Sequence, residues 1–237
     1  MKGPQMPLAP GMTLAELVLQ RPASADLLER LRLDYCCGGR RTLADACAER
    51  GLDEATLIAM VETLGERPEP RPTVHDVRRA SITELCDHIV QAHHEPARRA
   101  LSQIAELLER VVRVHGGGHP ELADLRRVFT GLREELEEHF ALEEKMVFPA
   151  CRAVDSADSA AGLDQSVLAM CEDSHEFAGE ALTAMRELSG GYEAEHAFCG
   201  THRKLLEALE RFELELHQHV HEENNVLFPR VRERLTA

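Results

Sequence analysis

The sequence predicts an all-α protein, made of a small N-terminal helical domain and an up-down four-helix bundle. Three observations support this fold class. Aromatic residues make up only 4% of the 237 residues and Trp is absent, and such a composition, rich in Ala, Leu and Glu, favours helices over strands. Apolar residues recur at helical spacing through four long segments. Short glycine-rich or polar loops separate these segments, as is typical of antiparallel neighbours in a bundle.

Three stretches divide the chain. Residues 1–65 are expected to form the small helical domain, with an Asp-Tyr-Cys-Cys-Gly-Gly turn at 34–39. Residues 66–80 hold several prolines and are expected to form a linker. Residues 81–237 are expected to form the bundle. Its long helices are expected over about 81–114, 121–153, 164–188 and 192–234, with a polar loop at 155–163 between the second and the third.

Several helix starts are marked by capping residues. The segments 13–16 and 81–84 read as capping boxes, in which a Ser or Thr and a Glu three residues later satisfy free backbone N–H groups. The segment 42–45 reads as a weaker box. Pro22 suits the first turn of a helix that we expect to run to Leu33.

The charge and the apolar pattern exclude several classes of partner. A net charge of −15 argues against nucleic acid, which needs a basic patch, and against an anionic membrane surface. No apolar run is long enough to span a bilayer, and the N-terminus lacks the apolar core of a signal peptide. We therefore expect a cytoplasmic protein, whose seven cysteines are free thiols.

An internal repeat carries the candidate chemistry. Four features of the second bundle helix recur 80 residues later in the fourth: Glu135 as Glu215, His139 as His219, Glu143 as Glu223, and Phe148-Pro149 as Phe228-Pro229. The preceding helices each supply a single histidine, His94 and His175, at 45 and 44 residues before the histidine of the repeat. Each helical hairpin therefore offers one His and one His-x3-Glu pair.

The spacing fits a pair of metal ions. Residues i and i+4 lie on one helix face, about 6 Å apart along the axis, so a His and a Glu can turn inward together. Four neutral imidazoles and two bridging carboxylates suit iron, manganese or zinc better than calcium or magnesium. The predicted metal ligands are His94, His139, Glu143, His175, His219 and Glu223. Paired Glu-x2-His motifs of ferritin-like bundles and the His-Glu-x2-His zinc-protease motif are absent from the sequence.

A structural explanation competes with the metal site. One His-x3-Glu pair on a helix is more often an exposed polar contact than a metal site. An exposed face, however, has no reason to keep His, Glu, Phe and Pro at one offset, and a duplicated structural hairpin would preserve apolar positions first. Pro96 follows His94 by two residues and is expected to kink the helix there, but the offset to His175 favours His94 over its neighbours.

These motifs resemble a known family. Residues 81–237 are similar to a hemerythrin-like domain, and the Asp-Tyr-Cys-Cys-Gly-Gly segment resembles the N-terminal domain fused to it in the iron–sulfur cluster repair family. The segment 219–229 is also close to that family's pattern. The resemblance implies two non-haem irons with two His on each, two bridging Glu and an oxo bridge. It further implies homodimers and a role in restoring iron–sulfur clusters damaged by nitric oxide or peroxide.

Two further sets of residues are candidates for the site. Adjacent cysteines rarely pair with each other, so Cys36 and Cys37 are read either as small residues of a tight turn or, as the resemblance favours, as thiols for redox chemistry or iron transfer. Glu135 and Glu215 lie one turn before the ligand histidines and either support the ligands and line an access path or form solvated helix flanks. Four other histidines close to the ligands in sequence are off the register of the repeat, and are expected at the surface or behind the ligands: His88, His93, His217 and His221. The remaining cysteines are expected to be packing residues.

Three functions remain open at this point. The first is repair of damaged iron–sulfur proteins by iron donation, or by binding and reducing nitric oxide, which leaves open whether the protein is an enzyme. The second is a di-iron module that binds or senses dioxygen or nitric oxide without repair. The third is a bundle without metal. The fused cysteine-bearing domain favours the first, since sensors usually carry a larger output domain.

Overall fold

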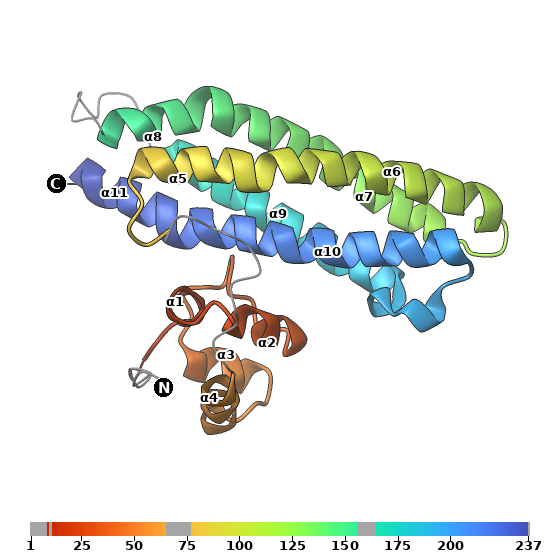
Figure 1. Ribbon diagram of the computed structural model, residues 1–237, viewed down its shortest axis with the longest axis horizontal. Coiled ribbons are helices and arrows are strands. Elements are labelled where there is room, and N and C mark those ends of the chain that lie inside the picture. The colour runs from red at the N-terminus through yellow and green to blue at the C-terminus, as the bar shows by residue number, and fades with distance from the viewer. Residues whose placement is uncertain (1–8, 10, 65–76, 156–164, 237) are drawn as a thin grey trace, which may run out of the picture.

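The computed structural model describes residues 9, 11–64, 77–155 and 165–236, and nearly all of their regular structure is helical. Four long helical rods lie side by side in an elongated bundle, and the N-terminal helices pack as a separate unit against one flank (Figure 1). The described residues form no β-strand, so the all-α fold class is confirmed. The expected linker and the expected loop at 155–163 lie mostly outside the described residues.

Three of the four rods are composite. The first consists of α5 (Ile82–Ile89), the π-helical segment η1 (Val90–His94) and α6 (Glu95–His115). The second consists of α7 (Glu121–Leu142), the π-helical segment η2 (Glu143–Val147) and α8 (Phe148–Asp155). The third is the single helix α9 (Gln165–Leu188). The fourth consists of α10 (Gly200–Glu222), the π-helical segment η5 (Glu223–Leu227) and α11 (Phe228–Thr236). Successive rods run antiparallel (Figure 1).

Each composite rod carries a proline directly after its π-helical segment. Pro96, Pro149 and Pro229 all occupy the second position of the α-helix that follows. Proline has no N–H and clashes with the carbonyl four residues earlier in a regular α-helix, and one wide turn relieves both problems without ending the helix. The kink expected near His94 is therefore a π-helical segment ending at His94.

The fourth rod starts later than predicted. Residues 190–192 and 194–196 form the short 3₁₀ turns η3 (Gly190–Tyr192) and η4 (Ala194–His196), and α10 begins only at Gly200. Gly190, Gly191 and Tyr192 all have positive φ, which no α-helix allows. The Tyr192 hydroxyl donates to Glu213 at 2.9 Å and ties this turn to α10.

The N-terminal unit has its own core. It consists of α1 (Leu14–Gln20), α2 (Ser24–Arg30), α3 (Leu43–Glu49) and α4 (Glu54–Thr63). The capping box at Thr13 is confirmed, and Thr42 caps α3 by accepting from the Asp45 N–H at 3.1 Å. Leu14, Leu28 and Leu57 are almost completely buried in one apolar cluster. This unit therefore has what a small folded domain needs.

The helix expected from Pro22 to Leu33 is shorter than predicted. In the structure, α2 begins two residues after Pro22 and ends at Arg30. Arg32 has a φ of 57°, in the left-handed region, so the helix cannot reach Leu33. This early end places Leu33 in the core of the N-terminal unit and lets the turn 34–39 face the bundle.

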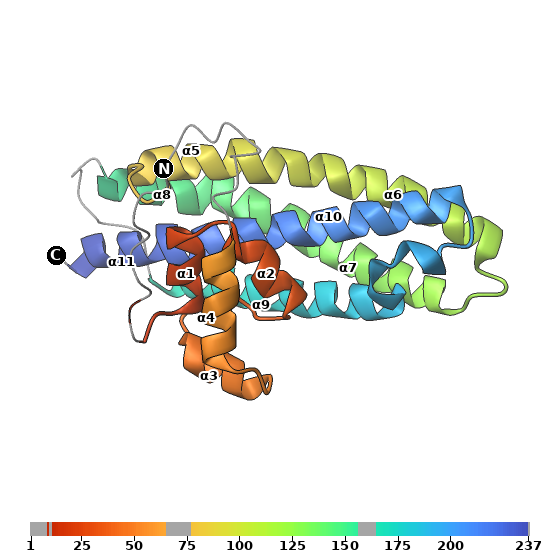
Figure 2. The same ribbon diagram turned by 60° about the horizontal axis from the view of Figure 1, so that its bottom comes forward.

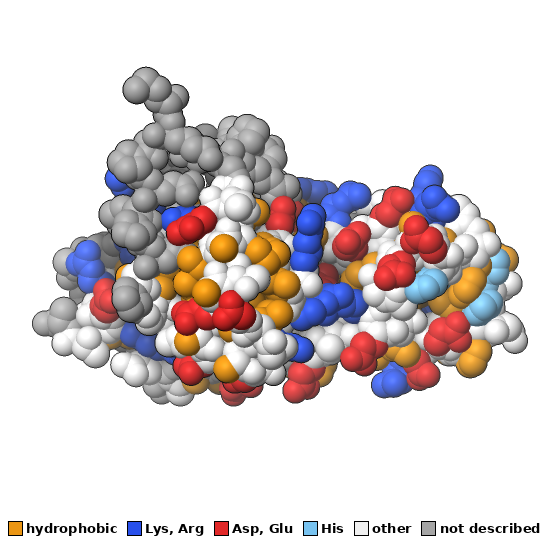
Figure 3. Space-filling model, turned by 90° about the horizontal axis from the view of Figure 1, so that it is seen from below, with side chains coloured by type: hydrophobic (Ala, Val, Ile, Leu, Met, Phe, Trp, Pro, Cys, Tyr) orange, Lys and Arg blue, Asp and Glu red, His pale blue; other side chains and the backbone are white. Residues whose placement is uncertain are grey.

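The N-terminal unit docks on the fourth rod (Figure 2). The Asn225 amide donates to the carbonyls of Tyr35 and Cys36, at 3.3 and 2.9 Å. The His217 imidazole pairs with Glu29 at 2.7 Å. Seen from the N-terminal side, hydrophobic side chains gather over this unit and charged ones surround them (Figure 3). The contacts with the bundle thus centre on the Cys-Cys-Gly-Gly turn.

Two apolar cores divide the bundle, and polar residues lie between them. One core contains Phe129, Leu132 and Phe140, and the other contains Phe148 and Phe228. Each of the six predicted ligands falls, along its own rod, where one core gives way to the other. Burying ionisable groups costs free energy unless a partner compensates them, so this polar layer is the candidate functional site.

Candidate metal centre

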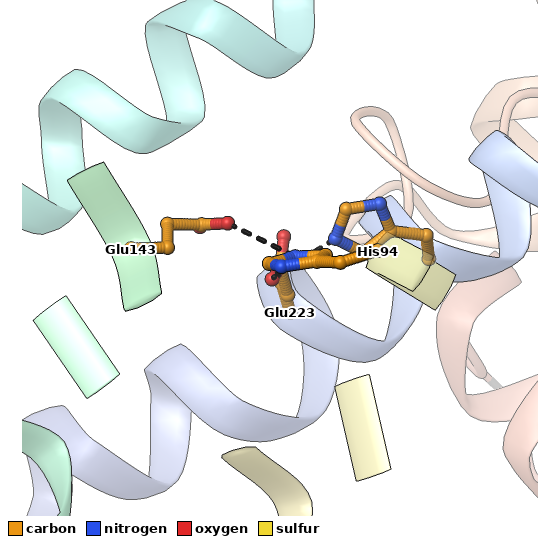
Figure 4. Close-up of side chains that lie close together, drawn as sticks. His94, Glu143 and Glu223 are labelled. Carbon is orange, nitrogen blue, oxygen red and sulfur yellow. Dashed lines mark ion pairs between the residues drawn. The ribbon is translucent and has the colours of Figure 1, made fainter. Parts of the chain in front are cut away.

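The six residues predicted as ligands meet in the middle of the bundle. His94 ends η1, His139 lies on α7 and His175 on α9. His219 lies on α10, and Glu143 and Glu223 begin η2 and η5. All six are buried, with exposed fractions of 0 to 4%. The labelled side chains in Figure 4 come from three rods and point toward one another. The structure therefore brings together residues up to 129 positions apart in the chain, from His94 to Glu223.

The six side chains form two groups that share both glutamates. One group is His94, His219, Glu143 and Glu223, and the other is His139, His175, Glu143 and Glu223, with all ligand atoms of a group within 4.8 Å of one another. Each group takes one His from each helical hairpin. The two hairpins thus meet in each group, because the antiparallel rods bring His94 beside His219 and His139 beside His175.

The glutamates are placed to bridge. Glu223 presents Oε1 to His219 Nε2 and Oε2 to His175 Nε2, both at 3.0 Å. Glu143 presents Oε2 to His94 Nε2 and to His139 Nε2, both at 3.3 Å. Atoms bound to one ion at about 2.1 Å lie roughly 3.0 to 3.4 Å apart. The spacing of the donor atoms therefore suits one metal ion in each group.

Unpaired polar atoms support a metal site. Both carboxylate oxygens of Glu143 and of Glu223, with Nε2 of His94 and of His219, are buried and have no hydrogen-bond partner among the described residues. Buried polar atoms are nearly always paired, and an isolated buried carboxylate is especially costly. Burial and the neighbouring Glu223 raise the pKa of Glu143 well above its usual value. A cation in each group would compensate all of these atoms.

Burial favours the neutral form of three of the ligand histidines, which is the form that coordinates a metal. Burial lowers the pKa of His94 to about 4 and that of His139 to about 3. Burial also lowers the pKa of His219. Apolar rings close the site around them, because Phe140 stacks on His94 at 4.3 Å and Phe228 on His175 at 6.1 Å between ring centroids. Metals bind the neutral imidazole, so at neutral pH no proton must leave these rings first.

Two residues that the sequence analysis did not single out hold the ligand rings. Glu144 accepts from Nδ1 of His94 at 2.9 Å, and Asn224 accepts from Nδ1 of His175 at 2.8 Å. Such partners fix the tautomer and the orientation of a metal-binding histidine. Glu144 and Asn224 are themselves 80 residues apart. The offset of the repeat was thus the signal that pointed to them, although the residue types differ.

The other candidates lie around the centre. Glu135 is half-buried and accepts from the Ser174 hydroxyl at 2.7 Å, beside His175, and Glu215 is half-buried on α10. His221 is fully buried and donates to the Tyr35 carbonyl at 3.2 Å, so it belongs to the contact between the N-terminal unit and the bundle. His88, His93, His217 and His221 are all buried or half-buried, so of the two positions expected for them, at the surface or behind the ligands, the first does not hold.

The Cys-Cys turn reaches the metal centre. The Asp34 carboxylate holds the turn by accepting from the backbone N–H groups of Cys36 and Cys37, both at 3.0 Å. The Cys37 thiol lies 3.7 Å from the carbonyl oxygen of His175. Cys36 is buried and Cys37 is half-buried. One thiol of the pair therefore contacts the backbone of a candidate ligand.

The other cysteines are mainly packing residues, as predicted. Cys47, Cys86, Cys151 and Cys171 are buried, and Cys199 is half-buried. All seven cysteines are free.

The fold and the polar layer define a hemerythrin-type cation-binding bundle. A family model described as the hemerythrin HHE cation binding domain matches residues 86–231, and one described as a domain of unknown function (DUF542) matches residues 10–65. No helix of the described residues is long and apolar enough to cross a membrane.

Curated relatives carry both parts. An iron-sulfur cluster repair protein, ScdA, from Staphylococcus haemolyticus (strain JCSC1435) is 31% identical over 218 residues, which cover 91% of this chain and 95% of the relative. The iron-sulfur cluster repair protein YtfE from Pectobacterium carotovorum subsp. carotovorum (strain PC1) is 31% identical over 92% of this chain and 95% of its own. YtfE from Escherichia coli O17:K52:H18 (strain UMN026 / ExPEC) is 31% identical over 92% and 94%. The chain belongs to the iron–sulfur cluster repair family.

Proposed function

We propose that the six ligands hold two non-haem iron ions, oxo-bridged, and that the protein repairs iron–sulfur clusters damaged by nitrosative or oxidative stress. The observation that carries the proposal is the pair of four-residue groups sharing two buried carboxylates. Imidazole with carboxylate suits iron, and relatives that match nearly the whole chain are named for this repair. The client proteins are accordingly iron–sulfur proteins.

The chain's own residues prepare the centre for such work. Iron bound there supplies redox chemistry, open positions for nitric oxide or dioxygen-derived molecules, and a store of iron for donation. Glu144 and Asn224 hold the rings of His94 and His175 with their Nε2 atoms turned inward. Phe140 and Phe228 cover these rings and keep water away. Together they keep the donor atoms fixed while a ligand or an ion comes and goes.

The Cys36–Cys37 turn is the proposed route for iron transfer. A thiolate is a soft ligand that iron accepts, and Cys37 lies against His175 at the wall of the centre. The docking contacts of Asn225 hold the turn there. A thiol thus lies against the helix that carries the candidate ligand His175. All seven cysteines are free, which suits the reducing cytoplasm that we propose as the site of action. Homodimers are proposed on the family resemblance.

The metal centre is tested by metal content and spectrum. We expect two irons per chain after extensive dialysis, with the visible absorption of an oxo-bridged pair. Glu223→Gln should lose most of the iron, because it removes one of the two shared carboxylates. The matched control Glu172→Gln changes a glutamate on α9 that pairs with Arg232 instead, and should keep two irons. A colourless wild-type protein without iron contradicts the proposed centre.

Repair is tested with a nitric-oxide-damaged iron–sulfur enzyme such as aconitase. Wild-type protein should restore its activity, and the Glu223→Gln variant should not. The double variant Cys36→Ser, Cys37→Ser should repair more slowly, whereas Cys199→Ser, which changes the other half-exposed cysteine, should repair normally. Normal repair by the double variant would remove the cysteines from the mechanism. A protein that binds nitric oxide but restores nothing would be a sensing module.

A further inference from the structure

A second cluster of metal-binding type lies beside the six ligands. It consists of His88 on α5, His93 on η1 and Glu222 on α10, whose ligand atoms lie within 4.8 Å of one another. His88 Nε2 is 3.1 Å and His93 Nε2 is 3.2 Å from the same oxygen, Oε2 of Glu222. The side chains of His93 and Glu222 are 5 and 7% exposed, and that of His88 is 12% exposed. The cluster is therefore buried but open on the His88 side.

The π-helical segment creates this cluster. His88 and His93 are five residues apart, and in a regular α-helix that spacing turns the second side chain about 140° from the first. The extra residue in η1 makes a spacing of five act like a spacing of four. The two rings consequently share one face, with centroids 5.5 Å apart. The same wide turn that places His94 in the metal centre thus places His93 in the cluster.

The donor atoms have the spacing of a metal site. Ligands of one first-row ion lie roughly 3.0 to 3.4 Å apart, and both distances to Glu222 fall in this range. The other oxygen of Glu222 accepts from the Gln218 amide at 2.9 Å, which fixes the carboxylate. Two imidazoles and one carboxylate are the donor set of open non-haem ferrous sites. His93 contacts Glu222 through Nε2 alone, and its buried Nδ1 has no hydrogen-bond partner among the described residues.

We propose that His88, His93 and Glu222 form a third metal site, which binds a divalent transition-metal ion, ferrous iron in the cell, more weakly than the central pair. Three protein donors instead of four, and the opening at His88, make the site exchangeable. Its position assigns it a role. His93 stacks on the ligand His219 at 5.4 Å with 10° between the rings, so the third ion sits directly outside the His94–His219 group and passes iron into and out of it.

Binding at the third site is tested with cobalt. Protein already holding its irons is dialysed against Co²⁺ in oxygen-free buffer, and iron and cobalt are then counted per chain. We expect one Co²⁺ per chain with a visible band typical of nitrogen and oxygen ligands. His88→Ala should weaken its binding at least tenfold. His88→Gln, which keeps a hydrogen-bonding side chain, should do the same and guards against misfolding. His196→Ala, at an exposed histidine, should bind cobalt like the wild type.

The result is decisive in either direction. Equal cobalt binding by wild type and both His88 variants, or none by the wild type, overturns the third site. The proposed passage of iron through the third site rests on the proposed two-iron function, whereas the cobalt count does not. The third site and the two-iron centre can therefore be refuted separately. A wild type with fewer than two irons that still binds cobalt through His88 would refute the two-iron centre alone.

The passing role is tested by the rate of iron removal. A ferrous chelator is added to reduced protein, and the loss of iron is followed by the colour of the chelate. We expect His88→Ala and His88→Gln to lose iron at least threefold more slowly than the wild type and His196→Ala, with the same final iron content before chelation. Equal rates in all four proteins would leave a third site that takes no part in iron exchange and would overturn the role.

Discussion

Glu144 and Asn224 lie outside the candidate ligand set and hold two of its histidines in place. Each accepts a hydrogen bond from Nδ1 of a ligand histidine, at 2.9 and 2.8 Å. A neutral imidazole whose Nδ1–H donates a hydrogen bond carries no proton on Nε2, so the lone pair of Nε2 is free to bind a metal. The two side chains therefore select the tautomer that His94 and His175 need. Glu144 is itself held by Arg98 at 2.8 Å.

Loss of such a partner should weaken metal binding without removing a ligand. For Asn224→Ala we expect metal affinity to fall about 10- to 100-fold, measured by competition with a coloured chelator. The neighbouring Asn225→Ala is the matched control, because Asn225 donates to the N-terminal unit, and its metal affinity should change by less than about twofold. Equal losses in the two variants would mean that Asn224 acts through the local helix, not through His175.

At the residue scale, the sequence predicted which six side chains are candidate ligands, but not which of them share one metal position. An offset of 80 residues, or 81 for His94 and His175, selected six side chains that the structure places together. The pairing of His94 with His219 depends on which rods are neighbours, and no local pattern records that. Glu144 and Asn224 shared the offset but differ in type, so a search for identical residues passes over them. Regular helical spacing does not place His88 and His93 together, because their common face depends on a π-helical turn.

At the scale of single elements, the π-helical segments link the chain's prolines to its chemistry. Pro96, Pro149 and Pro229 each follow one of these segments, and a candidate ligand lies at an end of every segment. The sequence showed that Pro96 disturbs a helix, but a kink, a break and a wide turn can each accommodate a residue without an N–H. Packing on both sides of the disturbance selects the wide turn. Helix starts marked by capping boxes were easier, since they depend on neighbours in the chain.

The turn before α10 supplies a test of pH dependence at this scale. Nδ1 of His202 accepts from the backbone N–H of Phe198 at 3.2 Å, so the ring is neutral in the folded protein. Burial, and then the nearby His115 and His119, lower the pKa of His202. The folded protein therefore binds fewer protons at this ring than the unfolded chain, and stability from it is complete above about pH 6.5 and is lost as the pH falls toward the lowered pKa.

The difference between wild type and His202→Gln isolates this contribution. We expect the free energy of unfolding, measured by urea titration of the metal-free protein, to fall less steeply in the variant between pH 7 and pH 5. The two curves should run parallel above pH 7, where the ring is neutral in both states. Parallel curves over the whole range would show that His202 does not titrate on unfolding.

At the scale of the whole molecule, the bundle tolerates its polar layer because metal is expected to compensate it. Metal removal should lower the melting temperature, since the orphaned atoms of Glu143 and Glu223 stay buried. An ion present at a hundred times its dissociation constant adds about 2.7 kcal/mol, or roughly 5 to 10 °C for a chain of this size. Calorimetry of protein with and without iron measures the shift. The Glu223→Gln variant should show little change in melting temperature on metal removal. A change equal to that of the wild type would mean that the stabilising metal binds elsewhere.

The association of the two units also belongs to this scale, and the sequence could not show it. No local sequence pattern shows how residues 34–39 meet the fourth rod, because the contacts join residues nearly 190 positions apart. Gly39 is the tightest point. A Cβ there would lie 2.5 Å from the Tyr35 carbonyl oxygen and 2.8 Å from Oδ1 of Asn225. The glycine is required by this close approach, not by its own backbone angles.

Gly39→Ala should therefore loosen the N-terminal unit from the bundle. Overpacking at such a contact costs about 1 to 3 kcal/mol, and we expect the Cys37 thiol to react faster with a thiol reagent while the bundle keeps its metal. Gly131→Ala on α7 is the matched control, because nothing lies within 4 Å of its new Cβ. It should leave the thiol rate unchanged and stabilise the helix by about 0.5 to 1 kcal/mol. If Gly39→Ala also left the thiol rate unchanged, the reagent would reach Cys37 without any loosening of the N-terminal unit, and the contacts at Gly39 would not control access to this thiol.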